Sequence, residues 1–330
     1  MIEPKLFAKL PEYVTTPDGM AIDAEGNLIL ACPNYAEIYA KKPGCILKID
    51  KERNIRKWVD VPAHPETGQA FPMGIAFGPD GDLYVVDNQG WSGKPELVNR
   101  GRILRLRIKN DMVIKCTVVA YNMEHPNGMR IKDGYVYVTQ SLLSKVKHPS
   151  GKLVSCVYKF ALDDEGIEIT NTLEDKNILT TFVTENPEMQ YGMDGIEFDF
   201  NGDLLVGNFG DGAVWRVKFN PDGSVKEQFV WAQDAENLMS TDGMIMTPDG
   251  NLYIADFCAN AVACVYPDGR VERIAQSPDC TGFDGGLDQP GEPIWWDNRL
   301  VVTCFDLVVD DTKVNTEHEL PATLSELVLN

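Results

Sequence analysis

Four short motifs place an oxygen-bearing side chain before a glycine and an apolar residue. They lie far apart in the chain and read Asp18-Gly19-Met20, Asn127-Gly128-Met129, Asp194-Gly195-Ile196 and Asp242-Gly243-Met244. Carboxylate and amide oxygens are the ligands that hard divalent cations prefer. Converging carboxylates repel one another unless a cation or a proton lies between them. If the fold brings these motifs together, they predict a cation site.

Other kinds of site find little support in the sequence. The eight Cys show no CxxC spacing, only four His are present, and no HExxH occurs, so a thiolate or His-rich zinc site is disfavoured. Neither a GxSxG nucleophile elbow nor a Gly-rich nucleotide loop is present. We therefore expect one divalent cation, Ca²⁺ first, with Mg²⁺, Mn²⁺, Zn²⁺ and Fe²⁺ as alternatives.

An internal repeat explains how such distant motifs could meet. A tight turn, usually Asx-Gly, followed by a short apolar strand, recurs six times about every 55 residues. The six copies span residues 25–32, 80–87, 133–140, 201–208, 249–256 and 297–304. Asp-Gly and Asn-Gly are strong hairpin signals, because both turn residues need positive φ. Six repeats use the whole chain, so we expect a single domain over residues 1–330.

The segments around each turn predict further strands. A short strand precedes the turn, as in 74–77 and 195–198, and two more follow it, as in 44–49 and 102–106. Four antiparallel strands per repeat, rich in Gly and aromatic residues, are typical of a β-propeller blade. The predicted fold is therefore all-β, a six-bladed β-propeller with four antiparallel strands per blade. Segments 5–14 and 322–329 are expected to share one blade.

Propeller geometry predicts where the four motifs lie. The first strand of each blade lines the central axis, so the motifs would converge at one channel mouth. The ends of the second strands, including Asp87, Asp256 and Asp306, would border the same face, and the long insertions would add loops beside it. The candidate substrate-binding residues there are His125, Asn208, Asp256, Trp91, Tyr191 and Glu292.

At these residues the chain resembles the senescence-marker-protein/gluconolactonase family of six-bladed propellers. The resemblance covers nearly the whole chain. Its most specific parts are Pro126-Asn127-Gly128-Met129, Met193-Asp194-Gly195-Ile196, Thr241-Asp242-Gly243-Met244 and Pro321-Ala322-Thr323-Leu324-Ser325.

The resemblance implies one divalent cation at the channel mouth, held by Asp18, Asn127, Asp194 and Asp242. Two positions depart from the family pattern. The family commonly has Glu in blade one within Glu-x-Pro-x-Trp, where Asp18 stands here, and Asn in blade four, where Asp194 stands here. The stretch 292–295, Glu-Pro-Ile-Trp, looks like a displaced relative of the blade-one motif and offers Glu292 as an extra ligand or acid.

The leading hypothesis for the activity is hydrolysis of a sugar-acid lactone. The cation would polarise the ring carbonyl. Either a loosely coordinated Asp242 would act as the general base on water, or the metal would lower the pKa of that water. Two rival hypotheses stay open, because a fold does not fix a function. One keeps the same site for phosphotriester hydrolysis, a lyase reaction or a condensation. The other is a propeller that binds a partner without catalysis.

Composition limits the partners that we expect. Hydrophobic residues make up 44% of the chain and charged residues 24%, as in a folded globular protein. The net charge of −20 disfavours nucleic acid and anionic membranes, both of which attract basic side chains. A small-molecule substrate, which the resemblance implies to be a sugar lactone, is therefore the expected partner, and the oligomeric state is left open. With no signal peptide at the start, we expect a cytoplasmic protein with reduced thiols.

Overall fold

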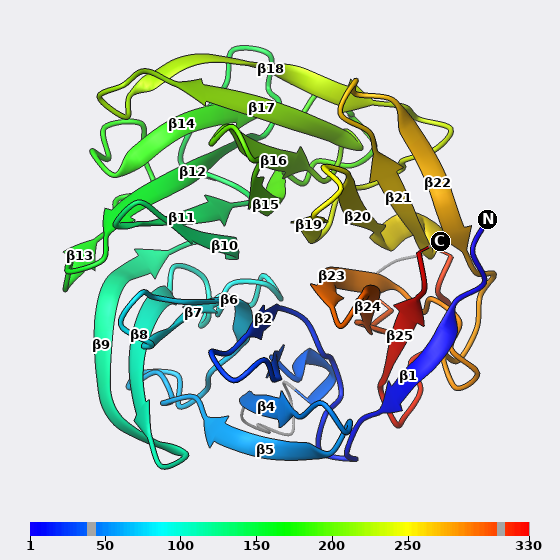
Figure 1. Ribbon diagram of the computed structural model, residues 1–330. Coiled ribbons are helices and arrows are strands. Elements are labelled where there is room, and N and C mark those ends of the chain that lie inside the picture. Colours follow the sequence, from blue (N-terminus) through cyan, green and yellow to red (C-terminus); the bar gives the residue numbers. More distant parts are fainter. Residues whose placement is uncertain (38–43, 309–313, 330) are drawn as a thin grey trace. The chain divides into compact units, whose positions relative to one another are not determined.

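The computed structural model describes residues 1–37, 44–308 and 314–329. These ranges contain β-strands, two 3₁₀ helices, η1 (Tyr35–Glu37) and η2 (Phe257–Ala259), and no α-helix. The strands form six sheets (Figure 1). Two compact units divide the chain. We call residues 19–184 and 191–193 the middle unit, and residues 1–18, 185–190 and 194–330 the terminal unit.

The middle unit holds blades one, two and three. Blade one consists of β2 (Met20–Ile22), β3 (Leu28–Cys32), β4 (Cys45–Ile49) and β5 (Ile55–Asp60). Blade two consists of β6 (Pro72–Phe77), β7 (Leu83–Asp87), β8 (Gly101–Lys109) and β9 (Met112–Met123). Blade three consists of β10 (Pro126–Lys132), β11 (Tyr135–Gln140), β12 (Val154–Ala161) and β14 (Ile178–Val183). The short β13 (Ile167–Glu168) pairs in parallel with β9, so part of a predicted insertion covers the edge of blade two.

The terminal unit holds blades four, five and six. Blade four consists of β15 (Met193–Phe198), β16 (Leu204–Asn208), β17 (Ala213–Phe219) and β18 (Val225–Gln233). Blade five consists of β19 (Met244–Met246), β20 (Leu252–Asp256), β21 (Ala261–Val265) and β22 (Val271–Gln276). Blade six consists of β23 (Pro290–Trp296), β24 (Arg299–Cys304), β25 (Thr323–Leu327) and β1 (Lys5–Lys9).

The predicted fold class is confirmed. Each repeat forms one four-stranded antiparallel blade, and the chain is an all-β, six-bladed β-propeller. The two ends of the chain share blade six, because β1 pairs with β25 (blue beside red in Figure 1). The resulting blade joins residues from opposite ends of the sequence.

The hairpin turns lie where they are predicted, but most are of another type. Positive φ at both turn residues occurs in Asp133-Gly134 and in Asp297-Asn298. In blades one, two, four and five, only the glycine, such as Gly26, has positive φ. There the Gly26 N–H donates to the Asp23 carbonyl, and the pattern is that of a three-residue loop with a bulge. A glycine takes a positive-φ position in five of the six turns, which is why the sequence signal finds them, and Asn298 takes this position in the sixth.

The core of each unit lies between neighbouring blades. In the middle unit, Ile46, Val85 and Leu104 belong to one buried cluster that spans blades one and two. In the terminal unit, Val214 and Ile254 belong to a cluster that spans blades four and five. The second strand is buried along its whole length in blades one, two, four and five, so both of its faces are apolar.

A polar residue at the end of the second strand anchors the loop before the first strand. Gln140 accepts a hydrogen bond from the backbone N–H of Glu124, sixteen residues earlier, and Asp256 accepts one from Ser240 at the same spacing. Asp87 does the same for Phe71. These side chains end strands, as their position predicts, and they also fix the segments that lead into the first strands.

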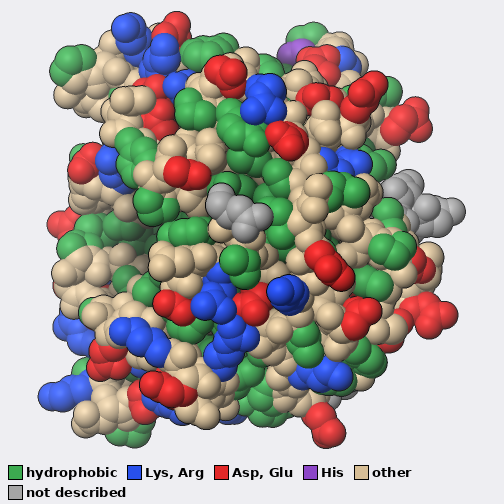
Figure 2. Space-filling model, turned by 45° about the vertical axis from the view of Figure 1, so that its right-hand side comes forward, with side chains coloured by type: hydrophobic (Ala, Val, Ile, Leu, Met, Phe, Trp, Pro, Cys, Tyr) green, Lys and Arg blue, Asp and Glu red, His purple; other side chains and the backbone are tan. Residues whose placement is uncertain are grey.

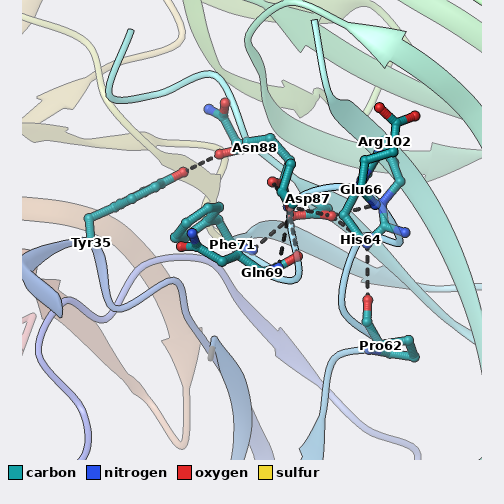
Figure 3. Close-up of polar contacts among 11 residues, drawn as sticks. Tyr35, Pro62, His64, Glu66, Gln69, Phe71, Asp87, Asn88 and Arg102 are labelled. Atoms are coloured by element: carbon teal, nitrogen blue, oxygen red, sulfur yellow. Dashed lines mark hydrogen bonds and ion pairs between the residues drawn. The ribbon is translucent and has the colours of Figure 1, made fainter. Parts of the chain in front are cut away.

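Asp87 is the best satisfied of these anchors (Figure 3). Its carboxylate is completely buried. Besides the Phe71 N–H at 2.8 Å, it accepts hydrogen bonds from Gln89 Nε2 at 2.9 Å and from the Arg102 guanidinium at 2.6 and 2.8 Å. Arg102 also donates to the Pro62 carbonyl oxygen at 3.0 Å. A buried charge with this many partners is stable, whereas a buried charge without them is not.

The surface and the thiols fit the composition. On the face in Figure 2, acidic and basic side chains are interspersed. None of the helices in the described ranges has the length and apolar character of a membrane span. Six of the eight cysteines are buried, Cys280 is partly exposed and Cys116 is exposed. Cys32 and Cys45 face each other across β3 and β4.

We predict that Arg102→Met destabilises the protein by about 3–5 kcal/mol, because it leaves the Asp87 carboxylate buried without its cation. Urea unfolding followed by tryptophan fluorescence measures the loss. The matched control is Lys57→Met, which removes an exposed ion pair with Asp60. Exposed pairs contribute little, so the control should stay close to the wild type. Equal losses in the two variants would contradict this role for Arg102.

Candidate metal centre

The glycines of the four motifs allow neighbouring first strands to approach very closely. In the terminal unit, a Cβ atom added to Gly195 would lie 2.1 Å from the carbonyl oxygen of Asp242. One added to Gly243 would lie 2.8 Å from the Cα atom of Glu292. In the middle unit, Gly74 meets the Asn127 carbonyl oxygen in the same way, at 2.5 Å. No side chain fits at these contacts, so each glycine brings the motif of the next blade into close approach.

Four carboxylates come together in the terminal unit through these contacts. They belong to Asp18, Asp194, Asp242 and Glu292. Asp18 Oδ1 would lie 3.2 Å from a Cβ atom added to Gly291, beside Glu292. Asp18 and Asp194 are buried, and Asp242 and Glu292 keep some accessible surface. Three of the four predicted metal ligands are thus joined by an acid that the sequence analysis placed among the substrate-binding residues.

These carboxylates strongly perturb one another. Removal from water raises the pKa of Asp194 well above its usual value, and the charges of Asp18 and Glu292 raise it further, against a side-chain hydrogen bond from Asp242. The pKa of Asp242 is raised well above its usual value by removal from water and by the charges of Asp194, Asp18 and Glu292. Asp242 Oδ1 also accepts the Gly243 N–H at 3.0 Å. Without a cation, this mutual crowding therefore favours a protonated carboxyl group in the Asp194–Asp242 pair.

The donor set fits a hard divalent cation. All four side chains offer carboxylate oxygens, the ligands that such an ion prefers, and they come from four separate segments. A cation replaces the shared proton and removes the repulsion. Asp18, Asp194, Asp242 and Glu292 are the residues of the terminal unit that would hold it.

The fourth predicted ligand, Asn127, belongs to the middle unit. Asn127 is buried, and its Nδ2 donates to the Tyr191 hydroxyl at 3.3 Å. The same hydroxyl lies 2.6 Å from His125 Nε2, and the two rings meet edge to face. Burial lowers the pKa of His125 to about 4, so its imidazole is neutral at pH 7. Three residues that the sequence analysis singled out therefore form one uncharged polar group.

The other predicted substrate-binding residues occupy different surroundings. Trp91 stacks on Tyr35, with ring centroids 4.3 Å apart, and is partly exposed. Asn208 is completely buried, and its Oδ1 accepts the Asp211 N–H at 3.4 Å. Asp256 is completely buried as well, and it accepts hydrogen bonds from the backbone of residues 239–240 and from Arg273.

Sequence reasoning missed a second acidic group. Asp288, Asp306 and Glu319 lie in blade six and in the segments beside it, and their ligand atoms lie within 4.8 Å of one another. Of the three, only Asp306 was expected at a functional face. The three lie in different loops and share no motif, so the sequence offers no signal that would join them.

Solved structures with this architecture include several enzymes. Searches of the sequence against protein-family models and against curated proteins find no match. A gluconolactonase from Xanthomonas campestris aligns over 99% of this chain and 95% of its own, with 14% identity and a TM-score of 0.63. Regucalcin from Agrobacterium tumefaciens, described as a calcium-binding protein, aligns over 99% and 93%, with 13% identity and a TM-score of 0.61.

The chain has the fold of the gluconolactonase and regucalcin propellers. This confirms the resemblance inferred from the motifs at the level of the fold. A virginiamycin B lyase from Staphylococcus aureus also aligns with this chain, over 100% of both chains, with 13% identity and a TM-score of 0.56. The fold therefore does not identify the reaction, so the function must be argued from the residues of the site.

We predict that, in chelator, the wild type loses stability relative to Asp242→Asn as the pH rises from about 4 to 8. The folded-state pKa values of Asp194 and Asp242 are raised. The folded state thus holds these protons more tightly than the unfolded state. This stabilisation is full below the unfolded pKa of about 4 and is lost as the pH rises toward the folded values. Urea unfolding at a series of pH values measures it.

At saturating Ca²⁺ the wild type should be more stable than Asp242→Asn, because the cation stabilises the wild type more than a variant that lacks one carboxylate. Asp268→Asn is the control, since Asp268 lies exposed in a turn of blade five. Its stability should change with pH and with Ca²⁺ in the same way as that of the wild type. If wild type and Asp242→Asn keep the same difference in stability over this pH range, the four carboxylates do not form the coupled group described above.

Proposed function

We propose that this chain is a divalent-cation-dependent hydrolase that opens a small lactone, with a sugar-acid lactone as the substrate. The observation that carries the proposal is the group of four carboxylates at the starts of the first strands, in which burial and the charges of Asp18 and Glu292 raise the pKa of both Asp194 and Asp242. Such a group is unstable without a cation and fits one well. The fold shared with a gluconolactonase and a calcium-binding regucalcin supports the same activity.

We propose Asp18, Asp194, Asp242 and Glu292, all in the terminal unit, as ligands. Asn127, in the middle unit, stays a prediction of the family resemblance. When bound, the cation would supply Lewis-acid stabilisation of the negative charge that develops on the lactone carbonyl oxygen. Ca²⁺ suits a set of oxygen donors in a flexible shell.

Asp242 is the general base in this proposal. It keeps accessible surface, whereas Asp18 and Asp194 are buried, so it is the better placed to meet a water molecule. Its carboxylate takes a proton from the water as the water oxygen bonds to the carbonyl carbon. When the ring C–O bond breaks, the proton passes to the departing oxygen, and the product is the open hydroxy acid.

The uncharged group of His125, Tyr191 and Asn127 suits recognition of sugar hydroxyls. A neutral imidazole, a phenol and an amide offer both donors and acceptors without net charge. Trp91 offers a partly exposed aromatic face. The complete burial of Asn208 and Asp256, and the backbone groups that they hold, favour a role in positioning loops.

Chelation and a substrate panel test the activity. We expect the protein to hydrolyse sugar-acid lactones, to lose this activity in chelator and to regain it with Ca²⁺. An aryl phosphotriester and a cyclic depsipeptide represent the rival hydrolase and lyase reactions. Turnover of either in place of lactones would replace the proposed substrate, and no turnover of any of them with Ca²⁺ bound would favour a non-catalytic binding protein.

We predict that Asp242→Asn lowers kcat for the lactone by about 10²–10⁴-fold, the usual contribution of a general base. Steady-state kinetics at saturating Ca²⁺ separate this effect from loss of the cation. Asp268→Asn, in the same blade, should keep the wild-type kcat. Full activity of Asp242→Asn would remove Asp242 from the mechanism.

A further inference from the structure

A second group of carboxylates lies in the terminal unit, in and beside blade six. Asp288 precedes β23, Asp306 follows β24, and Glu319 precedes β25. One carboxylate oxygen from each lies within 4.8 Å of the others. These residues are separate in sequence and in role from Asp18, Asp194, Asp242 and Glu292.

Asp288 is the unusual member of this group. It is 1% exposed, and within residues 1–37, 44–308 and 314–329 neither of its carboxylate oxygens has a hydrogen-bond partner. Asp87 and Asp256 are equally buried, but an arginine and backbone N–H groups satisfy both of them. A buried carboxylate with no donor is costly, and proteins rarely keep one without an ion or a proton. Burial, followed by the charges of Asp306 and Glu319, raises the pKa of Asp288 to about 8.

The surrounding residues add oxygen atoms and little positive charge. Asp306 accepts hydrogen bonds from Asn315 Nδ2 at 3.1 Å and from the Glu319 N–H at 2.8 Å, which fix its orientation. Asn315 Oδ1 and Glu319 Oε2 are buried and have no hydrogen-bond partner in the part of the chain that the structure describes. Among the described residues, His318, 3.4 Å from Asp306, is the basic group that forms an ion pair with these carboxylates. One histidine cannot balance three acids.

We propose that Asp288, Asp306 and Glu319, together with the amide oxygen of Asn315, form a second cation site that binds Ca²⁺. Three carboxylates and one amide oxygen, completed by water, make up a typical calcium shell. The partnerless oxygens of Asp288, Asn315 and Glu319 gain their missing partner in the ion. No lactone chemistry is needed for this site.

The site would hold blade six together. The ligands come from the segment before β23, the segment after β24 and the segment that leads into β25. β25 in turn pairs with β1, the first strand of the chain. A cation here therefore links the loops of the blade that joins the two ends of the chain, and it should stabilise the protein whether or not the chain is a lactonase.

Calcium counting on the full chain tests the proposal. We compare Asp288→Asn with Glu317→Gln, an exposed acid of the same segment. After chelator treatment, equilibrium dialysis against Ca²⁺ should show about one bound ion fewer per chain in Asp288→Asn than in Glu317→Gln. The Ca²⁺-induced rise in Tm should also be smaller in Asp288→Asn. Equal calcium content and equal Tm shifts in the two variants would overturn the proposal.

Two further measurements keep the test decisive. Should Asp288→Asn not fold, Glu319→Gln must show the same loss of bound Ca²⁺. In crystals of the wild type grown with Ca²⁺, anomalous scattering should show an ion between Asp288, Asp306 and Glu319, and its absence there would overturn the site. Asp242→Asn should leave this ion in place, so failure of the lactonase proposal and failure of this one are told apart.

Discussion

The close approach of neighbouring first strands is the constraint on which the site depends. Glycine follows the acid at Gly195 and Gly243, and the backbone of the next blade occupies the space that a Cβ atom would need. The same glycines that let the blades pack therefore force their carboxylates together. Like charges that are packed and removed from water require a proton or a cation. The close packing of the first strands thus creates the group of carboxylates on which the proposed chemistry depends.

The buried acids of this protein fall into three groups, according to what lies beside each carboxylate. Asp87 and Asp256 anchor loops and are satisfied by arginine and by backbone N–H groups. Asp194 and Asp242 are satisfied by each other through a proton, and they fit a shared cation. Asp288 has no partner at all among the described residues. An unpaired buried charge is costly. Asp87 and Asp256, which have partners, therefore fit a structural role, whereas Asp194, Asp242 and Asp288 point to bound cations.

The fold restricts the function without choosing it. Propellers of this type include a gluconolactonase, a calcium-binding regucalcin and a virginiamycin B lyase, all at 13–14% identity to this chain. What favours a hydrolase here is local, namely the four carboxylates and the neutral His125–Tyr191 pair. The identity of the substrate is the part of the proposal that enzyme assays must decide.

The sequence alone determined the repeat, the six blades, the shared blade of the two chain ends and the motifs of Asp18, Asp194 and Asp242, because turns, strand alternation and Asx-Gly pairs are local signals. Tertiary structure decided the rest. It gave most hairpins a bulged loop in which only the glycine has positive φ. It brought the charge of Glu292 close to Asp194 and Asp242, and it joined Asp288 to Asp306 and Glu319. Those contacts link segments that share no motif, and whether a buried oxygen finds a partner depends on packing that no short stretch of sequence encodes.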